Sequence, residues 1–322
     1  MSVSQDGGAS WRSVAPPGFV PSTKYAVDAL GGSNLIVTSG SQASALVVAR
    51  STDAGATWTS EVVDATPKLA GTPDAVLDSV DVSFVDPDHG FLSVTYGYAH
   101  MNPQGATLTT TDGATTWSAT SLEDGPSQLL ALSATSAVVV IGPAATELEA
   151  TSDSGNTWAP LAIPGDQATA SSSIASLRLG GSNDHAEVVV GYDGGNAAHT
   201  LVDAITASTP PTVRQLADAG SVTPNAADIS PAGVAVIASG APSHTPDVRT
   251  VDSTGSVTPI ATTGIDNLPD RVVALSDDTF LASLTEQLCP GRTNCHTVAQ
   301  LWRSAGGGRT WQTIPIAAST SS

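Results

Sequence analysis

The residues best suited to acid–base chemistry are aspartates in or beside the connections between short apolar segments. Six share this setting: Asp78, Asp81, Asp124, Asp193, Asp228 and Asp270. Cleavage of a glycosidic bond requires two carboxyl groups that face one cleft. The sequence does not select a pair, and it lacks a Gly-x-Ser-x-Gly elbow, a His-Glu-x-x-His pair and a phosphate loop. We therefore assign no catalytic residue, no metal site and no cofactor.

A second set of residues is suited to recognition. Tyrosine and histidine combine an apolar body with a polar tip, and four polar connections hold most of those in the chain. The residues that we predict to bind a ligand are Tyr96, Tyr98, His100, Tyr192, His199, His244 and His296. Such side chains on loops of a rigid scaffold favour a protein or a glycan as the partner.

Two cysteines, Cys289 and Cys295, flank a Pro-Gly turn in one of these connections. We predict a disulfide across this short loop, and a disulfide indicates an oxidising compartment. A metal site would need more ligands than His296 alone, and free cytoplasmic thiols are the alternative. We therefore expect a secreted or cell-surface protein whose export signal does not lie within this sequence.

One eight-residue pattern accounts for five of the six tryptophans. It reads SQDGGASW at 4–11, STDAGATW at 51–58, TTDGATTW at 110–117 and TSDSGNTW at 151–158. A fifth copy, SAGGGRTW at 304–311, has Gly306 at the aspartate position, and decayed copies place Asp203 and Asp252 there. The spacing between copies ranges from 41 residues (112 to 153) to 59 residues (53 to 112). This period indicates a repeat architecture.

The segments between the copies predict strands. KYAVDAL, NLIVTSG and ALVVARS precede Asp53; they are short, rich in Val, Ile and Leu, and separated by turn residues. With one more strand after each tryptophan, a unit has four antiparallel strands, A to D, and the pattern forms the C–D turn. Repeated four-stranded sheets predict an all-β fold, the β-propeller; a β-solenoid is the alternative.

The residues of the pattern are suited to form a turn. Aspartate and serine oxygens can accept hydrogen bonds from nearby backbone N–H groups, and Gly55 suits a left-handed backbone. We assign Asp6, Asp53, Asp112 and Asp153 to these turns. We expect the tryptophan of each copy to anchor its hairpin as a mostly buried ring: Trp11, Trp58, Trp117, Trp158 and Trp311.

The pattern resembles the Asp box, or BNR repeat, of sialidase-type propellers, which also occurs in sortilin-like receptors, xyloglucanases and photosystem II assembly-factor propellers. VSFVDPDHGFLSV, at 82–94, resembles the A–B hairpin of the last group. The resemblance implies that the box is a structural turn away from any active site. It also implies that a sialidase would need three arginines, a Tyr–Glu pair and an acid aspartate, and the Arg-Ile-Pro signature of sialidases is missing here.

Six complete units and an N-terminal partial one, residues 1–14, can be counted. We predict seven units, of which the first is incomplete; six blades with an extra hairpin are the alternative. The sequence predicts a single propeller domain over 1–316 and a disordered tail at 317–322. Because strands alternate in direction, A–B and C–D turns should share one face, and B–C loops and D–A connections the other.

The charge balance limits the partners. Thirty acidic residues face eleven basic ones, a net charge of −19, which disfavours nucleic acid and anionic membrane surfaces. No apolar run is long enough to span a membrane, and a monomer is expected. We expect a non-catalytic, extracytoplasmic binding or scaffold protein that uses its B–C loop face; the alternative is a sialidase-like glycoside hydrolase.

Overall fold

The computed structural model of the chain consists of strands and turns throughout the residues that it describes. These are 1–6, 10–17, 19, 24–31, 33–41, 45–63, 76–96, 104–122, 125–142, 146–164, 173–193, 198–221, 224–240, 245–288 and 296–314. None of them forms a helix long and apolar enough to cross a membrane. The predicted tail, 317–322, lies outside this part of the chain.

Contacts divide the chain into two compact units, which are described separately. The first contains Met1–Pro164, Ser182–Ala186 and Ile205–Arg214, and the second contains Gly165–Gly181, Glu187–Ala204 and Gln215–Ser322. The single domain predicted for 1–316 stays a prediction.

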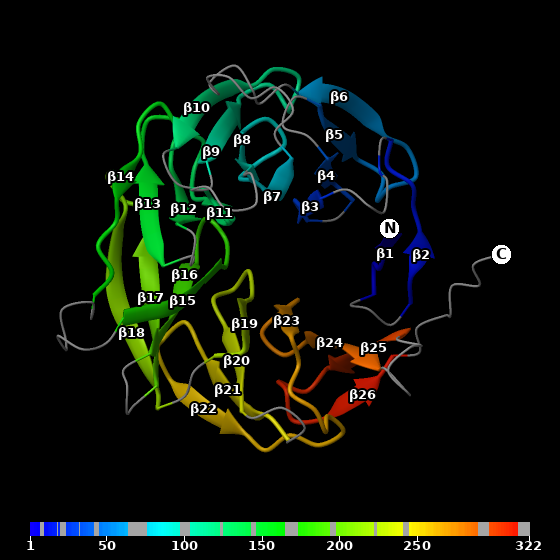
Figure 1. The fold of residues 1–322 in the computed structure, drawn as a ribbon, viewed down its shortest axis with the longest axis vertical. Coiled ribbons are helices and arrows are strands. Elements are labelled where there is room, and N and C mark those ends of the chain that lie inside the picture. Colours follow the sequence, from blue (N-terminus) through cyan, green and yellow to red (C-terminus); the bar gives the residue numbers. More distant parts are fainter. Residues whose placement is uncertain are drawn as a thin grey trace. The chain divides into compact units, whose positions relative to one another are not determined.

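The first fourteen strands form one two-stranded sheet and three four-stranded sheets, all antiparallel. Within each four-stranded sheet the strands lie side by side in chain order (Figure 1). The strands are β1 (Ser2–Val3), β2 (Arg12–Ser13), β3 (Lys24–Ala29), β4 (Leu35–Gly40), β5 (Leu46–Ser51), β6 (Thr59–Val63), β7 (Leu77–Phe84), β8 (Gly90–Tyr96), β9 (Gln104–Thr110), β10 (Ser118–Leu122), β11 (Gln128–Ala131), β12 (Ala137–Ile141), β13 (Glu147–Thr151) and β14 (Ala159–Pro160).

The remaining strands form three more four-stranded sheets in the same order. They are β15 (Ser173–Gly180), β16 (Ala186–Asp193), β17 (His199–Thr206), β18 (Thr212–Gly220), β19 (Ala226–Ile229), β20 (Ala235–Ser239), β21 (Asp247–Val251), β22 (Val257–Ile260), β23 (Arg271–Ala274), β24 (Phe280–Leu288), β25 (His296–Ser304) and β26 (Trp311–Thr313). Six complete units and one incomplete unit were predicted, and the sheets confirm both.

The second strand of each sheet is its most buried part. β4, β8, β12 and β20 are buried along their whole length. Their sequences are nearly continuous runs of apolar and small residues, as expected for strands that are covered on both faces. Apolar clusters join successive sheets: Ile36 of β4, Leu92 of β8 and Phe84 of β7 belong to one cluster. Burial of such side chains contributes roughly 1.5–3 kcal/mol each.

A backbone hydrogen bond joins the C–D turn to the A–B turn of the same sheet. The donor is a residue in the left-handed region, with φ between 57° (Ala54) and 70° (Gly113). The bonds run from Ala54 N to Ser33 O (2.8 Å), Gly113 N to Asp88 O (3.0 Å), Ser154 N to Thr135 O (2.9 Å) and Gly307 N to Asp278 O (2.8 Å). Within each of these sheets, the two turns therefore lie at one end and the B–C connection at the other.

The incomplete sheet is attached to the sheet that follows it. β1 and β2 occupy the places of strands C and D, with Ser2 opposite Ser13 and Val3 opposite Arg12. The Arg12 guanidinium donates to the carbonyl of Ala54 in the next C–D turn, at 2.7 Å. Val14 lies so close to Gly55 that a side chain on Gly55 would meet it at 3.0 Å. The C–D turns thus also contact the neighbouring sheet.

Candidate functional site

The two described tyrosines of the predicted binding set are buried. Tyr96 ends β8 and belongs to an apolar cluster, and Tyr192 lies in β16. Burial raises the pKa of Tyr96 to about 12. The sequence predicted that both rings project from loops; this is wrong for these two, because each falls on the buried end of a B strand.

The histidines of the predicted set are only partly described. His199 begins β17, is partly exposed, and has its Nε2 atom 3.4 Å from Asp218 Oδ1. His296 begins β25. Tyr98, His100 and His244 lie outside the described residues, as do Cys289 and Cys295. The histidine surface and the disulfide stay predictions.

The box aspartates (Asp6, Asp53, Asp112 and Asp153) organise their turns through the same hydrogen bonds. In the second copy, Asp53 Oδ1 accepts from Thr57 N at 2.8 Å and Oδ2 accepts from the Thr57 hydroxyl at 2.6 Å. The Ser51 hydroxyl donates to Asp53 and accepts from Gly55 N at 2.7 Å. Both carboxylate oxygens are thereby occupied within the turn, so these aspartates are structural.

Hydrogen bonds to the ionised form lower the pKa of these carboxyl groups. The pKa of Asp53 falls to about 2, mainly through the Thr57 hydroxyl and N–H and then Ser51. Asp6 and Asp112 also have pKa values of about 2, through Ser10 and Thr116 respectively. The Asp153 pKa is lowered by the N–H and hydroxyl of Thr157. None of these groups is suited to donate a proton near neutral pH.

The box tryptophans differ in exposure. Trp311 is 4% exposed, whereas Trp58, Trp117 and Trp158 are partly buried. Trp11 is 46% exposed, which corrects the prediction of a mostly buried ring. The reason lies in its sheet, which has no described A and B strands to pack on the ring. Phe84, at the end of strand A, performs that role for Trp117, with the ring centroids 6.2 Å apart.

The three degenerate copies retain different parts of the turn. Asp252 Oδ1 accepts from Ser256 N at 3.0 Å, so it acts as a turn aspartate. At Gly306 the carboxylate is missing, but the Ser304 hydroxyl still accepts from Gly308 N at 3.0 Å. Asp203, in contrast, lies inside β17 and is fully buried. Its assignment to a box is wrong; VDAIT continues the strand and lacks the hydroxyl and glycine that the turn requires.

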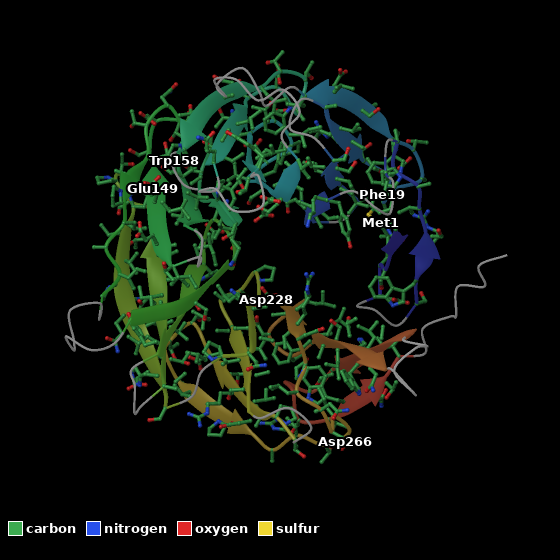
Figure 2. The ribbon with its side chains drawn as sticks, viewed as in Figure 1. Met1, Phe19, Glu149, Trp158, Asp228 and Asp266 are labelled. Carbon is green, nitrogen blue, oxygen red and sulfur yellow. The ribbon has the colours of Figure 1, made fainter. Side chains whose placement is uncertain are left out.

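A second group, the strand-A aspartates (Asp28, Asp81 and Asp228), joins successive four-stranded sheets. Asp28 Oδ2 accepts from Phe84 N at 2.6 Å, so β3 binds β7. Asp81 Oδ2 accepts from Leu129 N of β11 at 2.8 Å. In the second unit, Asp228 (labelled in Figure 2) lies on β19. It accepts from Ala274 N of β23 at 2.7 Å. Each carboxylate supplies an acceptor for a backbone N–H of the following strand A.

Burial raises the pKa of the strand-A aspartates, because a charged group loses water there. The pKa of Asp81 rises to about 7, through burial first and, to a smaller extent, through the charge of Asp28. The pKa of Asp228 rises to about 6, and that of Asp28 is also raised, in both cases through burial. A carboxyl group with a pKa near 7 could act as a general acid.

The other aspartates considered for catalysis are Asp78, Asp124, Asp193 and Asp270. Asp270 accepts from Thr285 N at 2.9 Å and from the Ser283 hydroxyl at 3.3 Å, which fixes it to the adjacent strand. Asp78 lies on β7 and Asp193 ends β16. Asp124 lies outside the described residues. The charge of Asp28 contributes to the raised pKa of Asp81, so these two carboxyl groups interact.

Sequence reasoning missed an aromatic patch, formed by the exposed Tyr25 and Val27 and the partly buried Phe19. Tyr25 is 56% exposed and Val27 is also exposed, on one side of β3. Phe19, labelled in Figure 2, packs edge-on against Tyr25, and the ring centroids lie 5.6 Å apart. Tyr25 lies opposite Ser39, next to the last residue of β4, so the patch lies at the B–C end of its sheet. The alternation of side chains between the two faces of KYAVDA could have predicted the patch.

Comparisons with solved structures identify the fold. The GH93 α-L-arabinofuranosidase of Fusarium graminearum, in complex with arabinobiose, matches 87% of this chain and 92% of its own, at 11% identity and a TM-score of 0.50. YCF48 bound to D1 peptide matches 93% and 86%, at 16% identity and a TM-score of 0.45. Trypanosoma rangeli sialidase matches 92% and 56%, at 11% identity and 0.44.

No protein-family model and no curated protein matches the chain. The likeness to solved structures is one of fold alone, at identities this low. Together with the six four-stranded sheets, the likeness to the arabinofuranosidase shows that the chain has the β-propeller fold that the repeated box predicted.

Proposed function

We propose that this protein is a non-catalytic binding or scaffold propeller that recognises a protein or a glycan at the B–C end of its sheets. The aromatic patch carries the proposal. Exposed aromatic rings held by a rigid strand are typical of recognition surfaces, because they offer large contact area at low entropy cost. Phe19 supports the Tyr25 ring, and Lys24 lies beside it at the start of β3.

The use of the carboxylates supports a binding role. Asp28, Asp81 and Asp228 each hold a backbone N–H of a neighbouring strand. A carboxylate that holds two strands together is constrained in position, and moving it during catalysis would leave a buried donor without an acceptor. The box aspartates are occupied within their turns.

Binding should be tested with a glycan array and a peptide array, followed by affinity measurements on the best ligand. We expect Tyr25→Ala to weaken binding about tenfold or more, the effect of losing an interface residue that contributes about 1.4 kcal/mol. Tyr25→Phe should retain most of the affinity. Val62→Ala, which removes an exposed side chain from β6, is the matched control. Equal affinity in wild type and Tyr25→Ala would refute the role of the patch.

One observation favours the alternative, a glycoside hydrolase. Asp81 has a pKa of about 7 and interacts with the charge of Asp28, and an acid paired with a second carboxylate is the arrangement that glycoside cleavage uses. A panel of fluorogenic glycosides, sialosides and arabinosides included, tests this function. Turnover that disappears in Asp81→Asn would establish the hydrolase and overturn the non-catalytic proposal.

An extracytoplasmic location is also part of the proposal, and the spacing of Cys289 and Cys295 supports it. Thiol titration of protein unfolded without a reducing agent should detect no free thiol. Two titratable thiols would remove the argument for export, without affecting the binding proposal.

A further inference from the structure

The last copy of the box, at 304–311 between β25 and β26, keeps the turn but has glycine in place of the aspartate. Gly307 and Gly308 are left-handed, with φ of 61° and 82°, as are the equivalent residues of three complete copies. The Ser304 hydroxyl accepts from Gly308 N at 3.0 Å, and the Trp311 indole N–H donates to Gly308 O at 2.8 Å. The backbone of this turn is therefore formed as it is where the aspartate is present.

The donors that surround a box aspartate are all retained in this copy. In the second copy, Asp53 accepts from the N–H and the hydroxyl of Thr57, at 2.8 and 2.6 Å, and from the Ser51 hydroxyl at 2.8 Å. The equivalent donors of the last copy are the N–H and hydroxyl of Thr310 and the hydroxyl of Ser304. None of these three groups donates a hydrogen bond to another residue of the described chain.

There is room for a carboxylate beside these donors. Gly306 occupies the aspartate position, and a β-carbon on it would meet no atom within 4 Å. Its φ lies outside the left-handed region, so the backbone there is suited to a residue with a side chain. Gly306, Arg309 and Thr310 are exposed. The donors of Thr310 can therefore be reached from solvent.

The box favours a negative charge although the chain is acidic overall. Hydroxyl and N–H donors lower the pKa of Asp112 to about 2, even though Asp88 lies in the A–B turn that is hydrogen-bonded to the same box. The last sheet repeats this arrangement, with Asp278 in the A–B turn and Gly307 as the donor. Arg309 adds a positive charge within the turn. Charge-assisted hydrogen bonds from such donors are suited to a carboxylate.

We propose that the box at 304–311 binds a carboxylate group supplied from outside the turn, in the position that an aspartate side chain fills in the complete copies. One oxygen would accept from the Thr310 N–H and the Ser304 hydroxyl, and the other from the Thr310 hydroxyl. A dissolved small carboxylic acid and a carboxyl group of a partner protein share this chemistry. The site lies at the C–D end of its sheet, so it does not rest on the function proposed for the B–C end.

Sodium acetate is the probe, because its two carbons correspond to the side chain of aspartate. Amide NMR of the whole chain at neutral pH follows Thr310, with sodium chloride at equal ionic strength as the reference. We expect a saturable downfield shift of the Thr310 amide, with a dissociation constant on the order of 10 mM. The Thr57 amide, whose acceptor Asp53 is in place, should not shift. Thr310→Val should weaken binding about tenfold.

Matched variants separate this site from general effects of anions. Gly306→Asp supplies the carboxylate within the turn, so it should abolish the acetate response and lower the unfolding equilibrium constant about tenfold. Gly306→Ala places a methyl group where the methyl group of acetate would lie, so acetate should be excluded while formate still binds. Asp53→Gly should make the Thr57 amide respond to acetate, and thermal unfolding checks that each variant is folded.

Peptides distinguish the two sources of the carboxylate. One peptide carries a single aspartate between blocked ends, and another has a free C-terminus. Binding about tenfold tighter than that of acetate would assign the site to a partner protein, and binding no tighter would assign it to a small acid. An equal response of the Thr310 amide to acetate and chloride would overturn the proposal, as would an undiminished acetate response in Gly306→Asp.

Discussion

The chain uses aspartate in two regions with opposite electrostatic results. The box aspartates lie in exposed turns, where hydroxyl and N–H donors lower their pKa values, to about 2 at Asp53. The strand-A aspartates are removed from water, and burial raises their pKa values to about 7 at Asp81 and about 6 at Asp228. Both groups accept backbone hydrogen bonds. Exposure, rather than the presence of a hydrogen bond, decides the direction of the shift.

The two groups also have different structural roles. A box aspartate closes its own turn, within four residues of sequence, as Asp53 does with Thr57. A strand-A aspartate joins strands that are far apart in sequence, as Asp28 does with Phe84. Aspartate thus closes turns in one setting and joins successive sheets in the other. The contributions of the two groups to stability should depend on pH in opposite directions.

The largest expected effect concerns Asp228. Its folded pKa of about 6 lies above the ordinary value of 3.8, so between these pH values the folded chain holds a proton that the unfolded chain has released. Stability should therefore fall as pH rises from about 4 to about 6, by up to about 3 kcal/mol. Asp228→Asn cannot ionise and should lose this part of the pH dependence, measured by urea unfolding across the range.

Burial rather than a neighbouring charge causes this shift, so about 1 M salt should leave the slope largely intact. Parallel stability curves for wild type and Asp228→Asn would contradict the burial of this carboxyl group, and with it the contrast between the two regions.

The next effect concerns the hydroxyl group that supports a box aspartate. Ser51→Ala leaves the N–H of Gly55 without its acceptor at 2.7 Å, and should lower the free energy of unfolding by about 1–3 kcal/mol. Ser51→Thr is the control, because Thr110 and Thr151 make the same bonds in their copies. Chemical denaturation of the three proteins measures the difference. A threonine variant as unstable as the alanine variant would show that the hydroxyl is not responsible.

A smaller effect tests the backbone of the box. Ser154 is left-handed, with φ of 59°, where Gly113 and Gly307 serve other copies. Ser154→Gly should raise the free energy of unfolding by about 0.5–1 kcal/mol, because the left-handed conformation is unfavourable for a residue with a β-carbon. Gly155→Ala, one residue later, should destabilise, since its β-carbon would come 2.9 Å from Thr109. Both changes can be measured by thermal unfolding, and a stabilising alanine would refute the assigned geometry.

The smallest effect concerns the contribution of a box aspartate to stability at low pH. The Asp53 pKa of about 2 lies below the ordinary 3.8, so its contribution to stability is present above about pH 4 and is lost as pH falls toward 2. Asp53→Asn should make acid unfolding less steep, by a small amount because the carboxylate is exposed. Carboxyl titration by NMR gives a direct check: Thr57→Val removes the strongest donor and should raise the pKa of Asp53. An unchanged value would assign the shift to another cause.

The fold could be predicted from sequence because its signals are local and repeated. The hydroxyl, aspartate, glycine and tryptophan of STDAGATW lie within one turn, so the pattern and the turn geometry coincide. Asp203 was misplaced where only the aspartate was used, without the hydroxyl and glycine that accompany it.

The candidate site was less accessible from sequence. Loop position predicted exposure for Tyr96 and Tyr192, but both fall in strand ends that are buried by contacts made elsewhere. The partnership of Asp28 with Phe84 depends on which strands become neighbours, and no spacing in the sequence reports that. Tyr25 could have been found, since the alternation of KYAVDA already places its side chain on the face of the strand away from that of the buried Ala26.

The backbone bond between the two turns of a sheet has a consequence for how the repeats diverge. It runs between an amide and a carbonyl, as from Gly307 to Asp278, so no substitution other than proline at the donor position deletes it directly. A copy can therefore lose its carboxylate, as at Gly306, and keep its hairpin. Mutational drift in such a turn is tolerated while its neighbours hold the fold, and the number of blades in a related chain will exceed the number of recognisable boxes.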